Sequence, residues 1–155
     1  METGTEPSPV LVSACLRGVP CRYDGRDKRV EALGELLAGR RVVAFCPEQA
    51  GGLPTPRRAA ELRGGDGHGV LDGSARVVDD TGSDVTAAFV AGAERALATA
   101  RRTGCADAVL MPRSPSCGAG EVHDGTFGGT LVPGEGVTAA PLKRHGIAVR
   151  EAPGV

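Results

Sequence analysis

Three of the five cysteines stand at or just after the end of a short apolar run: Cys15 after 10–14, Cys46 after 41–45 and Cys117 after 108–111. Thiolates are soft ligands, and three of them suit zinc or an iron–sulfur cluster while leaving one coordination position open for chemistry. An odd number of cysteines argues against a disulfide framework. Metal binding or catalysis is therefore the favoured interpretation of these thiols.

The other two cysteines, Cys21 and Cys105, have weaker claims to chemistry. Cys105 lies between a predicted helix and a predicted strand, so we expect it to be a buried packing residue. Cys21 could be a fourth ligand, a redox thiol or a packing residue. A redox pair of Cys15 and Cys21 is disfavoured, because their spacing is longer than that of motifs that tune thiol pKa values.

Polar residues suited to catalysis lie beside two of the three cysteines. Glu48 is two residues beyond Cys46 and could act as a general acid or base on a molecule bound at the metal. Ser114 and Ser116 precede Cys117, where hydroxyl groups could hold a polar heterocycle or the sulfur atoms of a cluster. The structural alternatives are a solvated surface glutamate and an ordinary turn.

Strands and helices alternate along the chain and must position these residues. A fourth, weaker strand is predicted over 146–150, and helices over about 27–38, from 84 to about 101, and over 138–145. The alternation predicts a single α/β domain, a Rossmann-like three-layer sandwich with a mostly parallel sheet. Because parallel strands end at one edge, where α/β folds bind ligands, the three cysteines are expected to converge there. Residues 51–84 are predicted to be a long functional loop, with at most a small hairpin, that could act as a lid.

Composition and charge limit the function classes. The 155 residues are 41% apolar and 24% charged, as expected for one globular domain. With 18 Lys and Arg against 19 Asp and Glu, the net charge of −1 supplies no strong field for extended nucleic acid. No apolar stretch approaches a membrane span and no secretory leader is recognisable, so we expect a cytoplasmic protein. Three Phe, one Tyr and no Trp favour a small ligand over a run of stacked bases.

Three motifs of the chain resemble the thiouracil desulfurase family. They are SACLRGVPCRYDG at 13–25, FCPEQ followed by GGLPTPR within 45–57, and RSPSCG at 113–118. The segment DGTF at 124–127 also fits, and the resemblance extends from about 10 to 149. Three separate motifs in the same order make this resemblance specific.

The resemblance implies an enzyme that holds an oxygen-sensitive [4Fe-4S] cluster through Cys15, Cys46 and Cys117, so protein prepared in air could lack the cluster. It implies non-redox desulfuration of 2- or 4-thiouracil, or of its nucleoside or nucleotide, to the oxo base with release of sulfide. This is a hydrolase-type C–S cleavage. Glu48 would manage the protons of the attacking water, and Ser114 or Ser116 would position the ring.

The desulfurase-like domain is expected to span 10–150, after a flexible N-terminal tail at 1–9. Two positions depart from the usual family pattern: Met111 stands where lysine is common, and His123 where tyrosine is common. If either side chain contacts substrate, specificity differs. The charge of −1 agrees with a free base or mononucleotide as the partner. The alternative is a zinc-stabilised binding module without turnover, in which Cys21 or His123 completes a closed four-ligand site.

Overall fold

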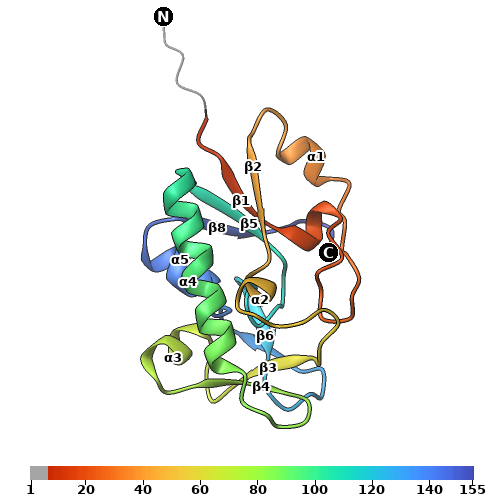
Figure 1. Cartoon of the computed structure of the whole chain (residues 1–155), viewed down its shortest axis with the longest axis vertical. Helices are drawn as coiled ribbons and strands as arrows, with labels where there is room; N and C mark the ends of the chain where they lie inside the picture. The colour runs from red at the N-terminus through yellow and green to blue at the C-terminus, as the bar shows by residue number, and fades with distance from the viewer. Residues whose placement is uncertain (1–6) are drawn as a thin grey trace, which may run out of the picture.

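Four parallel strands form the central sheet of the computed structural model, which describes residues 7–155 (Figure 1). They are β1 (Val10–Ser13), β2 (Val42–Phe45), β5 (Asp107–Leu110) and β8 (Ala148–Glu151), in the order β2-β1-β5-β8. Each strand overlaps a predicted apolar run, so the predicted parallel α/β sheet is confirmed. Residues 1–6 of the predicted tail lie outside the described residues.

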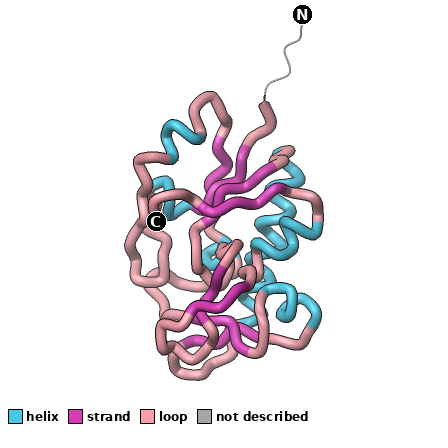
Figure 2. The backbone as a smooth tube through the Cα atoms, turned by 180° about the vertical axis from the view of Figure 1, so that it is seen from behind, coloured by secondary structure: helices cyan, strands magenta, loops and turns pink. Residues whose placement is uncertain are grey.

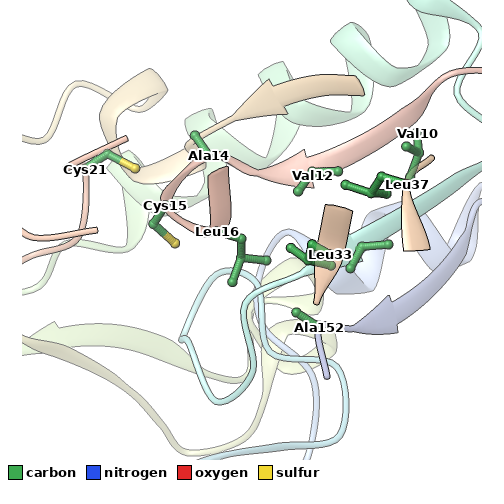
Figure 3. Packing of buried hydrophobic residues seen from close by; sticks show 10 residues of the cluster. Val10, Val12, Ala14, Cys15, Leu16, Cys21, Leu33, Leu37 and Ala152 are labelled. Carbon is green, nitrogen blue, oxygen red and sulfur yellow. The ribbon is translucent and has the colours of Figure 1, made fainter. Parts of the chain in front are cut away.

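Helical segments cover both faces of the sheet. The 3-10 turn η1 (Ala14–Arg17) and the short helix α1 (Leu33–Leu36) lie on one face, and α4 (Thr86–Thr103) and α5 (Ala139–Arg144) lie on the other. Figure 3 shows Val10 and Val12 of β1 packed with Leu33 and Leu37 on the first face. Leu11, between them in the strand, packs into the cluster on the opposite face. This alternation between two apolar layers explains why the strand is a continuous apolar run.

The predicted helix over about 27–38 is wrong in extent, since only the single turn α1 is helical. The backbone N–H of Lys28 donates to the carbonyl oxygen of Cys15 at 2.9 Å, and that of Val30 donates to Leu16 at 3.3 Å. These N–H groups donate to carbonyl oxygens of the η1 turn and not to carbonyl oxygens of a helix of their own. Residues 27–30 therefore run alongside η1 without helical structure, although the apolar spacing of the segment also fits a helix.

Two antiparallel hairpins lie at the other end of the molecule from the sheet (Figure 2). One pairs β3 (Ala60–Arg63) with β4 (Arg76–Asp79) and encloses α3 (Gly67–Asp72); the other pairs β6 (Glu121–His123) with β7 (Leu131–Pro133). The stretch 51–84 therefore contains the small hairpin that the sequence allowed, together with the helix α3, which it did not predict. The apolar side chains of β3, α3 and β4 pack with Phe89 of α4. This helix extends from the central sheet to the hairpins (Figure 1).

The short helix α2 (Pro47–Ala50) follows β2 and touches α4 backbone to backbone. A Cβ added at Gly92 of α4 would lie 1.9 Å from the carbonyl oxygen of Pro47, and one at Gly51 would lie 2.0 Å from that of Ala88. Only glycine permits this approach. The longest helix thus fixes the position of α2. No helix in the described part of the chain is long and apolar enough to span a membrane.

Candidate functional site

A cavity of about 470 Å³ lies at the carboxyl ends of β1, β2 and β5. Its volume falls in the range of small-molecule sites. The structure brings all six sequence-predicted site residues to its wall: Cys15, Cys46, Glu48, Ser114, Ser116 and Cys117. Cys21 also lines the cavity, whereas Cys105 is buried in the sheet core.

Cys15 and Cys46 are held by the turns that end their strands. Cys15 is buried in η1, which closes with Gly18 in a left-handed conformation (φ 94°). Cys46 is the half-buried residue that begins α2, and its carbonyl oxygen accepts the backbone N–H of Ala50 at 3.0 Å. Because η1 and α2 each follow directly from a strand of the parallel sheet, their thiols face one cavity.

Cys117 is held by the segment that leads into α5. The backbone N–H of Val137 donates to Pro115 at 2.9 Å, and that of Thr138 donates to Ser116 at 2.8 Å. A Cβ at Gly136 would lie 2.4 Å from the carbonyl of Ser116, so the two backbones are in direct contact. The loop of Ser116 and Cys117 is therefore rigid, although it has no regular secondary structure.

The pKa values of three cavity thiols, Cys21, Cys46 and Cys117, are raised by burial and by hydrogen bonds among the thiols. A hydrogen bond with Cys21, and then burial, raises the pKa of Cys46 far above its usual range. Burial raises the pKa of Cys117 to about 12, and a hydrogen bond with Cys15 raises the pKa of Cys21 to about 11. Thiols bind metals as thiolates, so a cationic group that enters this site must displace protons.

Glu48 is anchored at both carboxylate oxygens. Arg57 Nε donates to Oε1 at 2.8 Å, and Ser116 Oγ donates to Oε2 at 2.9 Å. The Glu48 and Arg57 side chains are only 15% and 7% exposed, so the ion pair is largely shielded from water. The carboxylate is held beside the thiols, and the solvated-surface interpretation of Glu48 does not describe it.

Ser114 and Ser116 form a directed hydrogen-bond chain to Glu48. Ser114 Oγ accepts the backbone N–H groups of Ser116 and Cys117, both at 3.1 Å. Its own proton is therefore available to Ser116 Oγ, 3.0 Å away. The Ser116 proton points to Glu48, because an ionised carboxylate can only accept. The chain ends at the one carboxylate oxygen that Arg57 leaves free.

Two cavity residues with clear structural roles were missed by sequence reasoning. Arg57 belongs to the GGLPTPR motif, but nothing in that motif indicates a partner for its guanidinium group. Glu61 is buried in β3, and its Oε1 accepts the backbone N–H groups of Gly125 and Phe127 at 3.0 and 3.1 Å. It thereby holds the DGTF loop against the cavity. No local pattern marks a strand glutamate for this purpose.

Met111 and His123, the two departures from the family pattern, both line the cavity. The Met111 backbone N–H donates to Ser13 Oγ at 2.9 Å. The Nδ1 atom of His123 is buried without a hydrogen-bond partner, a situation shared among the described residues only with the Thr138 hydroxyl. Both positions can therefore influence what the cavity accepts.

The donor set suits an iron–sulfur cluster better than a single zinc ion. Within residues 7–155, no three His, Cys, Asp or Glu side chains are placed to hold one metal ion. Structural zinc needs four ligands within about 2.0–2.3 Å of one centre, whereas each cysteine of a cluster binds a different iron atom. Three thiols spread around a cavity fit the second requirement. The zinc-module hypothesis finds no support.

The chain is similar to known proteins over most of its length. The model of the 2-thiouracil desulfurase family matches residues 10–152. The uncharacterized protein YbbK of Bacillus subtilis (strain 168) is 44% identical over 140 residues, covering 90% of this chain and 93% of that protein. Among solved structures, the [4Fe-4S]-dependent thiouracil desulfidase TudS matches with a TM-score of 0.82 and 47% identity, covering 94% of this chain and 91% of that one.

Proposed function

The chain belongs to the 2-thiouracil desulfurase family, and from this premise we propose that it replaces the thione sulfur of a thiolated pyrimidine by oxygen. The substrate is 2- or 4-thiouracil, or its nucleoside or nucleotide. Water provides the oxygen and sulfur leaves as sulfide, so no electrons are gained or lost. The observation that carries this proposal is the presence of three cysteines and an anchored carboxylate in one cavity.

Cys15, Cys46 and Cys117 are the residues that would hold the [4Fe-4S] cluster. When bound, the cluster supplies a Lewis-acidic iron with a position that no protein ligand occupies. The solved relative TudS is named as [4Fe-4S]-dependent, which supports the same cofactor here. The three thiols come from three separate loops, so ligation would also tie these loops together.

Glu48 is proposed to accept the proton of the attacking water. Attack on the ring carbon requires that water lose a proton, and a carboxylate positioned in the cavity wall can take it. The accepting oxygen is Oε2, which is bound by the Ser116 hydroxyl, since Oε1 is bound by the Arg57 cation. Ser114 and Ser116 supply hydroxyl groups at the same wall for the polar edge of the ring.

The cavity size and the thiol set favour a small substrate in a reducing compartment. A volume of about 470 Å³ is sufficient for a pyrimidine and offers no extended groove for a polynucleotide. All five cysteines are free thiols. We therefore place the reaction in the cytoplasm, where thiols and clusters stay reduced.

The test is to prepare and reconstitute the protein without oxygen and to measure iron, acid-labile sulfide and zinc. We expect about four iron and four sulfide per chain, the content of one [4Fe-4S] cluster. The loaded protein is then incubated with 2-thiouracil and 4-thiouracil, and the released sulfide and the oxo base are both quantified. We expect the two products in equal amounts. Stoichiometric zinc without labile sulfide, or a full cluster without sulfide release, would contradict the proposal.

A further inference from the structure

Arg57 uses all three nitrogen atoms of its guanidinium group inside the protein. Nε donates to Glu48, Nη2 donates to the carbonyl oxygen of Cys21 at 2.9 Å, and Nη1 donates to Pro54 O at 3.1 Å and Thr55 Oγ1 at 3.0 Å. Four hydrogen-bond acceptors and an exposed fraction of only 7% fix the orientation of this side chain. The next residue, Arg58, pairs with Asp80 but is 61% exposed.

The hydrogen bond from Arg57 makes the two Glu48 oxygens chemically different. Oε1 faces a permanent cation that cannot accept a proton. Oε2 faces the Ser116 hydroxyl, which can both donate and accept. Proton transfer at Glu48 is thereby confined to Oε2, the oxygen nearest the serine chain.

Arg57 also connects Glu48 to the loop that follows Cys15. Its backbone N–H donates to the carbonyl oxygen of Tyr23 at 2.7 Å. The Cys21 carbonyl that receives Nη2 also lies 3.8 Å from Cys46 Sγ, whose thiol donates to it. Arg57 thus binds the Cys21 carbonyl and the Glu48 carboxylate at the same time, and so links the loop of Cys21 to the wall that holds Glu48.

We propose that Arg57 is a positioning residue for desulfuration, which orients Glu48 so that Oε2 alone exchanges protons and which ties the Cys21 loop to this carboxylate. This inference rests on the proposed function. It assigns Arg57 no contact with substrate. Its removal should therefore lower turnover more than it weakens substrate binding.

The experiment compares Arg57→Ala and Arg57→Lys holoenzymes with the wild type, and uses Arg58→Ala as the matched control. We expect kcat per cluster to fall about 100-fold in Arg57→Ala, the scale of a misplaced catalytic group, with KM changed less than threefold. Added guanidinium ion should restore part of this kcat. Arg57→Lys should be intermediate, because one ammonium group cannot reach all the acceptors, and Arg58→Ala should match the wild type.

A second readout needs no turnover. In the metal-free protein, thermal unfolding of Arg57→Ala, Glu48→Gln and the double variant forms a double-mutant cycle. We expect the double variant to lose less in Tm than the sum of the two single variants, because each single change leaves a shielded group unpaired.

Several results would overturn the assignment of Arg57. One is an unchanged kcat per cluster in Arg57→Ala. Another is an activity loss that only follows a loss of iron, which would indicate a purely structural role. Additive Tm shifts in the cycle would also count against it. A wild-type holoenzyme that releases no sulfide would instead contradict the proposed function itself, and the role of Arg57 with it.

Discussion

The cavity end of the molecule and the contact between α3 and α5 each contain a half-buried glutamate paired with a cation. Glu48, at the cavity, gives one oxygen to Arg57 and the other to a serine hydroxyl. Glu135, at the α3–α5 contact, gives one oxygen to His68 at 2.5 Å and the other to Lys143. Glu135 therefore has both oxygens bound by basic side chains outside the cavity, whereas Glu48 has one oxygen bound by a hydroxyl group of the cavity wall. Pairing with a cation alone does not identify a catalytic base; its place in the cavity does.

The cysteines show the same division. Cys46 and Cys117 line the cavity, whereas Cys105 precedes β5 at the opposite end of the sheet and packs among apolar side chains. Its sulfur lies 3.3 Å from the Thr103 hydroxyl. The two settings predict different results for the same substitution.

Cysteine substitution should give the largest effect. Cys46→Ala removes one of the three proposed cluster ligands, so we expect iron and acid-labile sulfide to fall to a small fraction of the wild-type content. Cys105→Ala should retain full iron content. Both are measured after anaerobic reconstitution. Equal iron loss in the two variants would contradict the assignment of Cys46, and not Cys105, as a cluster ligand.

Exchange of the cavity glutamate should give the next effect. Glu48→Gln keeps the shape of the side chain but removes its basicity, so we expect sulfide release per cluster to fall about 100- to 10,000-fold with iron retained. The matched change at the α3–α5 contact, Glu135→Gln, should leave turnover within about twofold. Comparable losses in both variants would mean that Glu48 has no special chemical role.

The serine chain should contribute less. Ser116→Ala removes the hydroxyl donated to Glu48, and a hydrogen bond to a charged group is worth about 1.5–3 kcal/mol, so we expect a ten- to hundredfold drop in kcat per cluster. Steady-state sulfide release measures it. Activity equal to the wild type would show that Glu48 works without this chain.

The smallest effect should be on stability alone. Burial by itself would raise the pKa of Glu135, but hydrogen bonds from Lys143 and His68 outweigh it and lower this pKa. Glu135→Gln should therefore cost about 1 kcal/mol at pH 7, given the partial exposure of both partners, or a Tm lower by about 2–4 °C.

The pH dependence of this loss has a definite sign. A carboxylate whose pKa is lowered by folding stabilises the protein above its ordinary pKa and stops doing so as the pH falls through the lowered value. The Tm difference between the wild type and Glu135→Gln should thus narrow as the pH falls below about 4.5. Calorimetry at several pH values measures this, and a difference independent of pH would disprove the ionic origin.

The central sheet could be predicted because its two middle strands, β1 and β5, are buried on both faces and its strands overlap short apolar runs. The strand β3 could not be located, since it includes Glu61 and Arg63, whose side chains bind distant backbone groups. The helix over 27–38 was wrong because its donors serve the η1 carbonyls.

The candidate site divides in the same way. Cys15, Cys46 and Glu48 follow strand ends directly, so parallel topology alone brings them to one edge. Arg57 lies nine residues beyond Glu48 in an irregular segment, and only the folded chain places its guanidinium on that carboxylate. Residues proposed to carry the chemistry can thus be predicted from their position after a strand. The residue that orients Glu48 cannot be predicted in this way.

The glycine contact between α2 and α4 has a consequence for mutational screening. Gly92 lies in the middle of the long helix and does not line the cavity, yet any side chain there would push against the carbonyl oxygen of Pro47. The displacement would pass to the adjacent Cys46 and Glu48. In a screen for activity, substitutions at Gly92 would therefore score with variants of the cavity residues, and a map drawn from such scores would extend the site into a helix that does not line the cavity.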